Sequence, residues 1–140
     1  MLYVDTSILV AALTSESLTA DAQDWLGRQQ AGELAISDWV MTEFSAALSM
    51  KLRGGFLPAP DRAEALAVFS EMAEASFHVL PVTISDFRVA ARFADQHSTG
   101  LRAGDALHLA VASNHGARIR ALDKGLVAAA QALGISAALI

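Results

Sequence analysis

The sequence predicts an α/β fold with a mainly parallel sheet that is covered by helices on both faces. Two observations lead to this prediction. Short apolar runs alternate with helical patterns along the chain, which is typical of strand–helix–strand units. Glycines and prolines fall between these segments, where turns are expected. The chain has 140 residues and no low-complexity linker, so we expect one domain, residues 1–140.

The expected strands are short apolar runs: residues 1–4, 34–37, 77–80, 119–122 and 135–140. The first run stops at an acid, Asp5, and Thr6 or Ser7 can cap the short helix that follows to Leu13. If the first run is a strand of a parallel sheet, Asp5 lies at its carboxyl end, where open α/β sheets bind ligands.

The expected helices carry apolar residues at helical spacing: residues 6–13, 18–30, 38–53, 60–75, 85–97, 104–115 and 124–133. Ser37 or Asp38 can cap the third of these helices. The third, sixth and seventh helices end at the glycines that follow them, and Pro81 ends the third strand. Residues 98–103 are expected to form a loop.

The composition limits the classes of function that are possible. Hydrophobic residues make up 54% of the chain and the mean hydropathy is +0.39, so either much of the chain is buried or an apolar face is kept for a partner. No run reaches the roughly 18 apolar residues of a membrane span, and Asp5 interrupts any signal-peptide core. The absence of cysteine excludes disulfides and thiolate metal sites, as expected for a cytoplasmic protein.

The charge argues against a simple phosphate-neutralising surface. The net charge is −5 and the isoelectric point is about 5.2. A nucleic-acid ligand would therefore need a bound cation or a local basic patch.

Four of the 15 acidic residues occupy positions that suggest a site. Asp5 and Asp123 directly follow expected strands. Asp105 opens a helix whose continuation is nearly all apolar, and Glu43 shares a helix face with apolar neighbours such as Trp39. If the strands are adjacent, these four carboxylates can converge on one pocket.

Each acid also has a purely structural interpretation. Asp5 and Asp123 could be helix caps, and Asp105 could be a first-turn acid favoured by the helix dipole. Glu43 is harder to explain in this way, because ionised carboxylates are rarely buried unless they are paired or bind a metal.

Taken together, the four acids predict a divalent cation site. Crowded carboxylates repel one another, and a cation removes that repulsion. Ligation by oxygen alone suits Mg²⁺ or Mn²⁺. Such ions activate water and stabilise the leaving oxygen in phosphodiester hydrolysis.

Several segments, in order along nearly the whole chain, resemble the PIN-domain family: V-D-T-S, T-E-F, R-A-G-D-A-L-H-L-A and A-L-D-K-G-L…A-L-G-I. The most similar type is the VapC ribonuclease toxin of type II toxin–antitoxin systems. The resemblance implies a PIN-like α/β/α sandwich with a central, mainly parallel sheet of about five strands. It also implies an endoribonuclease that depends on Mg²⁺ or Mn²⁺, forms a homodimer and is inhibited by a VapB-type antitoxin. Alanine-rich helices, such as residues 63–75, could supply grooves for that antitoxin.

The resemblance implies a catalytic set of Asp5, Glu43, Asp105 and Asp123. Asp5 and Asp105 are expected to hold the metal directly. The resemblance implies that Glu43 and Asp123 bind the metal or its waters, or act as a base on the attacking water.

Supporting hydroxyls are also implied. Ser7 matches a family hydroxyl near the metal that orients a water or a phosphate, and Thr6 is a weaker candidate. The chain departs from the family at Ala121, where a Thr or Ser often stands two positions before the last acid. A supporting hydrogen bond to the acidic cluster is therefore expected to be missing.

His108 follows Asp105 by three residues, a spacing that is also found between metal ligands. Its place in an apolar helix favours a packed histidine instead.

Basic residues near the acids are open to two interpretations. Arg102 and Lys124 could meet phosphates at the pocket rim, and Lys51, Arg53 and Arg62 could form a basic lip for RNA. Arg102 and Lys124 could equally be solvated surface charges, and charges around loops, such as Lys51, Arg53 and Arg62, are usually solvated.

Three other functions compete with a toxin. A housekeeping PIN nuclease in RNA maturation would need no antitoxin. A haloacid-dehalogenase-like phosphatase would need a second acid two positions after Asp5, where Ser7 stands. A non-catalytic PIN-like binding module would be expected to have lost its acids, and all four are present.

Overall fold

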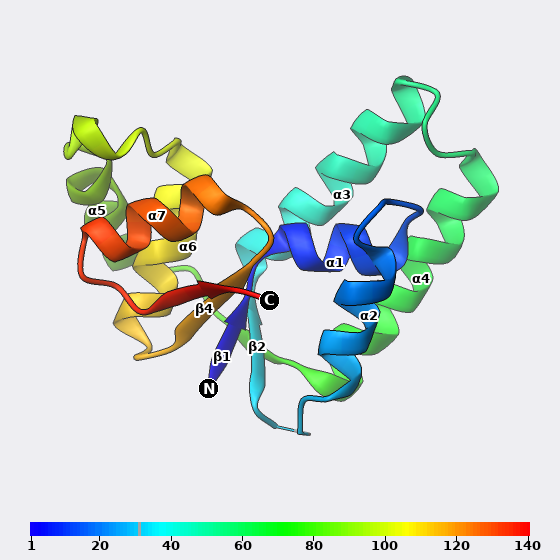
Figure 1. The fold of residues 1–140 in the computed structure, drawn as a ribbon, viewed down its shortest axis with the longest axis horizontal. Coiled ribbons are helices and arrows are strands. Elements are labelled where there is room, and N and C mark those ends of the chain that lie inside the picture. Colours follow the sequence, from blue (N-terminus) through cyan, green and yellow to red (C-terminus); the bar gives the residue numbers. More distant parts are fainter. Residues whose placement is uncertain (31) are drawn as a thin grey trace.

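The computed structural model describes residues 1–30 and 32–140 (Figure 1). In this part of the chain five strands form one sheet in the order β3-β2-β1-β4-β5, and every neighbouring pair is parallel. The strands are β1 (Leu2–Val4), β2 (Leu34–Ser37), β3 (His78–Leu80), β4 (Arg118–Ala121) and β5 (Ala137–Leu139). The predicted parallel sheet of about five strands is confirmed.

The strands lie between two groups of helices, α1 to α4 on one side and α5 to α7 on the other (Figure 1). The helices are α1 (Thr6–Leu13), α2 (Thr19–Gly27), α3 (Asp38–Arg53), α4 (Ala59–Ser76), α5 (Ile84–Ala94), α6 (Ala103–Asn114) and α7 (Lys124–Ala132). The predicted α/β class is confirmed. The expected helix over residues 85–97 ends earlier, at Ala94, and a short 3₁₀ helix (His97–Thr99) begins in its last residue and extends into the expected loop.

The strand order creates a crevice beside the central strand. From β1 the chain adds β2 and β3 on one side of the sheet, and it then returns to add β4 and β5 on the other side. Ligands bind at such a reversal point, beyond the carboxyl ends of the strands. The backbone N–H of Asp5 donates to the carbonyl of Arg120 over 2.9 Å, so the ends of β1 and β4 are joined where the crevice opens.

The high apolar content is explained mainly by burial. All residues of β1 and β2 are buried, and so are seven consecutive residues of α6, from Ala106 to Ala112. Some large apolar side chains stay exposed, among them Phe56 at the turn between α3 and α4 (83%) and Ile84 at the start of α5 (73%). No helix in the described residues is long and apolar enough to cross a membrane.

The start of α1 differs from the expectation. Asp5, rather than Thr6 or Ser7, is the N-cap, and its Oδ2 accepts from the backbone N–H of Ser7 over 3.0 Å. Asp5 has the extended backbone that an N-cap requires, whereas Thr6 and Ser7 are already helical. The hydroxyls of Thr6 and Ser7 are thereby free for other contacts.

A buried carboxylate fastens α5 to α6. The Asp86 side chain is 1% exposed, and its Oδ2 accepts from the backbone N–H and the hydroxyl of Thr83, each over 2.7 Å. Its Oδ1 accepts from Nδ2 of Asn114 at the end of α6 over 2.6 Å. Burial alone would raise the pKa of Asp86, but the hydrogen bonds from Thr83 and Asn114 outweigh burial and lower it.

Asp86→Ala is expected to lower the free energy of unfolding by about 2 kcal/mol, because it removes a capping box and a charge-assisted bond between two helices. Urea denaturation followed by circular dichroism measures the loss. The matched control is Asp61→Ala, an exposed acid in the first turn of α4, which should change stability by no more than about 0.5 kcal/mol.

The loss should also depend on pH. Because the pKa of Asp86 is lower in the folded chain, its contribution is present above the unfolded pKa of about 3.9. It disappears as the pH falls through the folded pKa. An Asp86→Ala penalty that is as large at low pH as at pH 7 would contradict this account.

Candidate metal centre

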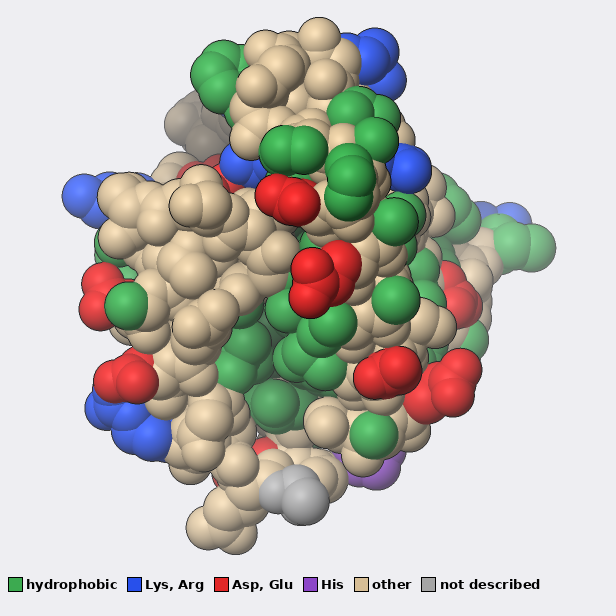
Figure 2. Space-filling model, turned by 90° about the vertical axis from the view of Figure 1, so that its right-hand side faces the viewer, with side chains coloured by type: hydrophobic (Ala, Val, Ile, Leu, Met, Phe, Trp, Pro, Cys, Tyr) green, Lys and Arg blue, Asp and Glu red, His purple; other side chains and the backbone are tan. Residues whose placement is uncertain are grey.

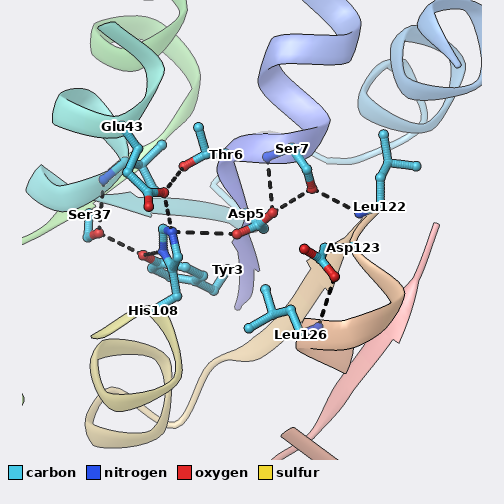
Figure 3. Close-up of polar contacts among 11 residues, drawn as sticks. Tyr3, Asp5, Thr6, Ser7, Ser37, Glu43, His108, Leu122, Asp123 and Leu126 are labelled. Atoms are coloured by element: carbon cyan, nitrogen blue, oxygen red, sulfur yellow. Dashed lines mark hydrogen bonds and ion pairs between the residues drawn. The ribbon is translucent and has the colours of Figure 1, made fainter. Parts of the chain in front are cut away.

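The four acids come from four different elements and meet beyond the carboxyl edge of the sheet. Asp5 follows β1 and Asp123 follows β4, while Asp105 lies in the first turn of α6 and Glu43 in the second turn of α3. Figure 3 shows Asp5 between Glu43 and Asp123. Parallel strands deliver two of these acids, and helices that begin at the same edge deliver the other two.

Asp5 is nearly buried, with 5% of its surface exposed. Its Oδ2 accepts from the Ser7 hydroxyl in addition to the Ser7 backbone N–H. Its Oδ1 lies 3.5 Å from Nε2 of His108. The carboxylate is therefore held in one orientation by the first turn of α1.

Ser7 joins the start of α1 to the end of β4. Besides donating to Asp5, its Oγ accepts from the backbone N–H of Leu122 over 3.0 Å (Figure 3). This contact anchors the residue before Asp123. Ala121 supplies no hydroxyl, but Ser7 in α1 fastens the end of β4 instead.

Asp105 and Asp123 line the same small cavity, of about 110 Å³, together with Arg102. Burial raises the pKa of Asp105, and the charges of Asp123 and Asp5 raise it further. Negative charge is therefore concentrated at this point of the molecule. Asp123 also caps α7, because its Oδ1 accepts from the backbone N–H of Leu126 over 3.0 Å.

Glu43 is paired rather than isolated. Its Oε2 accepts from the Thr6 hydroxyl over 2.7 Å and from Nε2 of His108 over 2.5 Å. Burial favours the neutral acid, but the hydrogen bonds that Glu43 accepts from His108 and Thr6 favour the carboxylate, and the pKa of Glu43 is lowered. Glu43 and Asp123 line one larger cavity of about 600 Å³, so Asp123 borders both cavities.

The donor set suits a hard divalent cation, since carboxylate oxygens are the ligands that Mg²⁺ and Mn²⁺ prefer. As the side chains stand, no three Asp, Glu or His residues of the described chain are gathered into a complete set of ligands. Asp5, Glu43 and Asp123 each direct an oxygen at protein donors. Burial is the main cause of the raised pKa of Asp105, and the repulsion from Asp123 and Asp5 that adds to it is the feature that a cation would relieve.

The sequence did not predict a hydrogen-bonded chain of three residues that reaches Glu43. His108 is packed, as its helix suggested, and is 1% exposed. Both of its ring nitrogens are engaged, Nε2 with Glu43 and Nδ1 with the hydroxyl of Tyr3 over 2.8 Å. Tyr3 in turn contacts Ser37 over 2.6 Å. A polar side chain inside a buried strand, such as Tyr3, was the available signal.

The comparison with protein families decides the identity of the fold. Residues 2–132 match the family model described as PIN domain. The chain belongs to the PIN-domain family. PIN domains are nucleases.

Solved structures show the same fold at low sequence identity. FitAcB from Neisseria gonorrhoeae is 19% identical, with a TM-score of 0.71 over 98% of this chain and 96% of that one. VapC20 from Mycobacterium tuberculosis, described as a sarcin–ricin loop cleaving toxin, is 19% identical, with a TM-score of 0.73 over 96% of both chains. A toxin–antitoxin complex from Klebsiella pneumoniae is 17% identical, with a TM-score of 0.61 over 88% of this chain and 87% of that one. No curated protein matches the sequence significantly.

Gly104 leaves room for the Glu43 carboxylate. A Cβ atom at this position of α6 would lie 2.8 Å from Oε1 of Glu43 and 3.3 Å from Cζ2 of Trp39. The first distance is shorter than any normal contact, and the end of the flexible Glu43 side chain is the part that can move. Glycine in R-A-G-D therefore has a steric role in the site of this PIN domain.

Gly104→Ala is expected to displace the Glu43 carboxylate and to slow nuclease activity about tenfold or more, because small misplacements of reacting groups are costly. The fold should be retained, since alanine is a better helix former than glycine. The measurements are the initial rate of cleavage and the midpoint of thermal unfolding. The matched control is Gly27→Ala in α2, where an added Cβ has no atom within 4 Å. Equal rates for both variants would contradict the steric role.

Proposed function

We propose that this PIN domain is an endoribonuclease that depends on Mg²⁺ or Mn²⁺ and is the toxin of a VapBC-type toxin–antitoxin pair. The observation that carries the proposal is the convergence of Asp5, Asp105 and Asp123 beyond β1 and β4, with Glu43 beside them. The raised pKa of Asp105 supports this in part: burial is its main cause, and the neighbouring charges of Asp123 and Asp5 add to it.

In this proposal Asp5 and Asp105 would hold the metal. When bound, the metal would lower the pKa of a water and stabilise charge on the leaving oxygen. Asp123 and Glu43 would orient that water or take its proton. Ser7 would fix the Asp5 carboxylate, and Thr6 would fix that of Glu43, since each hydroxyl already donates to its acid.

RNA is the substrate class that we infer. The neighbour VapC20 is described as cleaving the sarcin–ricin loop, and the sequence resemblance points to ribonucleases. Arg102 borders the cavity of Asp105 and Asp123, so it is the cation best placed to meet a phosphate next to the metal. Nζ of Lys51 is already paired with Glu16 over 2.6 Å, so Lys51 is less available to bind RNA as part of a basic lip.

We propose an antitoxin as the regulatory partner. A groove of about 520 Å³ is lined by α2, by α4 and by the end of α1. It includes Ala65 and Val68 of the alanine-rich segment. Figure 2 shows hydrophobic side chains in a hollow on this side of the molecule. Asp61 and Glu64 border the groove, so an apolar segment with basic residues would fit it. We also propose a cytoplasmic homodimer, as the family resemblance implies.

Val68→Arg is expected to weaken binding of the antitoxin at least tenfold, because a charged side chain would enter the apolar groove. The partner to use is the product of a small reading frame directly upstream of the gene. Calorimetry measures its affinity, and light scattering of the same samples reports whether the chain alone is a dimer. Val79→Arg, on the exposed part of edge strand β3, is the control. A housekeeping nuclease would have no such partner.

Cleavage of single-stranded and structured RNA by the purified, antitoxin-free chain tests the activity. It should require Mg²⁺ or Mn²⁺, stop in EDTA and fall about a hundredfold or more in Asp5→Asn and Asp105→Asn. Asp95→Asn, an exposed acid at the end of α5, should cleave like the unaltered chain. Equal cleavage by all variants would indicate a contaminating nuclease and remove the site assignment.

A further inference from the structure

A chain of buried hydrogen bonds reaches Glu43 from behind the site. It starts at the hydroxyl of Ser37 at the end of β2, continues through Tyr3 in β1 and ends at His108 in α6 (Figure 3). Ser37 and Tyr3 are fully buried and His108 is 1% exposed. The roles proposed above for the four acids and two hydroxyls do not use these residues.

The donors and acceptors of the chain can be ordered in one direction. Ser37 Oγ caps α3 by accepting from the backbone N–H of Val40, which leaves its own hydrogen for Tyr3. Tyr3 can then donate to Nδ1 of His108, and Nε2–H of His108 donates to Glu43. Burial holds the pKa of Tyr3 above its usual value, so the phenol keeps its hydrogen. In this arrangement the side-chain polar groups of Ser37, Tyr3 and His108 all have hydrogen-bond partners.

We propose that His108 is a positioning residue for Glu43 in the reaction of this nuclease. The inference rests on the proposed function and names a residue that acts through Glu43. The Nε2–H of His108 and the Thr6 hydroxyl together fix Oε2 of Glu43. The contact with Tyr3 fixes the orientation of the imidazole ring.

The geometry favours positioning over metal ligation and over simple packing. Both ring nitrogens of His108 are already bonded to protein groups, so neither has a lone pair directed at the cavities. An apolar residue would fill the same space but would leave the Glu43 carboxylate with only the Thr6 bond. Glu43 has three rotatable side-chain bonds, so a single anchor would let it sample several rotamers.

The test compares two substitutions of similar size. His108→Leu removes the N–H donor, and we expect it to lower kcat about tenfold with KM within about twofold. His108→Gln retains an N–H donor and should recover part of the loss. Tyr3→Phe removes the hydroxyl that orients the ring and should show a smaller fall in kcat. Circular dichroism and the thermal midpoint verify that each variant is folded at the assay temperature.

A double-mutant cycle distinguishes positioning from an independent effect. If His108 acts through Glu43, His108→Leu should change the rate less than about twofold in a Glu43→Gln background. A tenfold fall in both backgrounds would overturn the proposal, and so would an unchanged rate in His108→Leu alone.

The metal-free protein supplies a second readout that does not depend on activity. The Nε2–H hydrogen of His108 should give a low-field proton resonance that exchanges slowly with water, because it is buried and bonded to a carboxylate. It should shift upfield or vanish in Glu43→Gln. If the unaltered chain cleaves no RNA, the proposed function fails, and this resonance still decides whether His108 holds Glu43. A resonance that is absent, or unaffected by Glu43→Gln, would overturn the positioning role.

Discussion

Repulsion among carboxylates at the carboxyl edge of the sheet is the constraint that organises this molecule. Burial raises the pKa of Asp105, and the charges of Asp123 and Asp5 lie close enough to raise it further. The protein offsets part of this repulsion with hydrogen-bond donors. Ser7 donates to Asp5, Thr6 and His108 donate to Glu43, and backbone N–H groups donate to Asp5 and Asp123. The remaining negative charge is what a divalent cation would neutralise.

The structural and functional interpretations of the acids are therefore compatible. Asp5 caps α1 and Asp123 caps α7, so the positive ends of two helix dipoles face the site. An acid that caps a helix at the carboxyl edge of a parallel sheet is held rigidly and also faces the crevice. Capping needs only one carboxylate oxygen. The second oxygen of Asp5 lies 3.5 Å from Nε2 of His108, and both acids keep an oxygen that is not used for capping.

The polar groups behind the site matter for a different reason. Ser37, Tyr3 and His108 are buried among apolar side chains, where an unpaired polar group would be costly. They are paired with one another and with Glu43. These hydrogen bonds connect α3, α6 and the two strands β1 and β2. The hydrogen bonds that satisfy these buried groups also restrict the rotamers of Glu43. The same bonds therefore stabilise the fold and orient the Glu43 carboxylate.

The sequence by itself determined the α/β class, the order of strands and helices, and the four acids as candidates. Apolar periodicity, caps and glycine stops are local signals, and local signals decide local structure. The sequence could not determine which side chains contact these acids. Thr6 and Glu43 are 37 positions apart in the sequence, and His108 and Glu43 are 65 apart. Tyr3 and His108 are 105 apart. Likewise, the steric role of Gly104 exists only because α3 packs against the start of α6. Such contacts depend on how distant elements pack, and only the tertiary structure decided them.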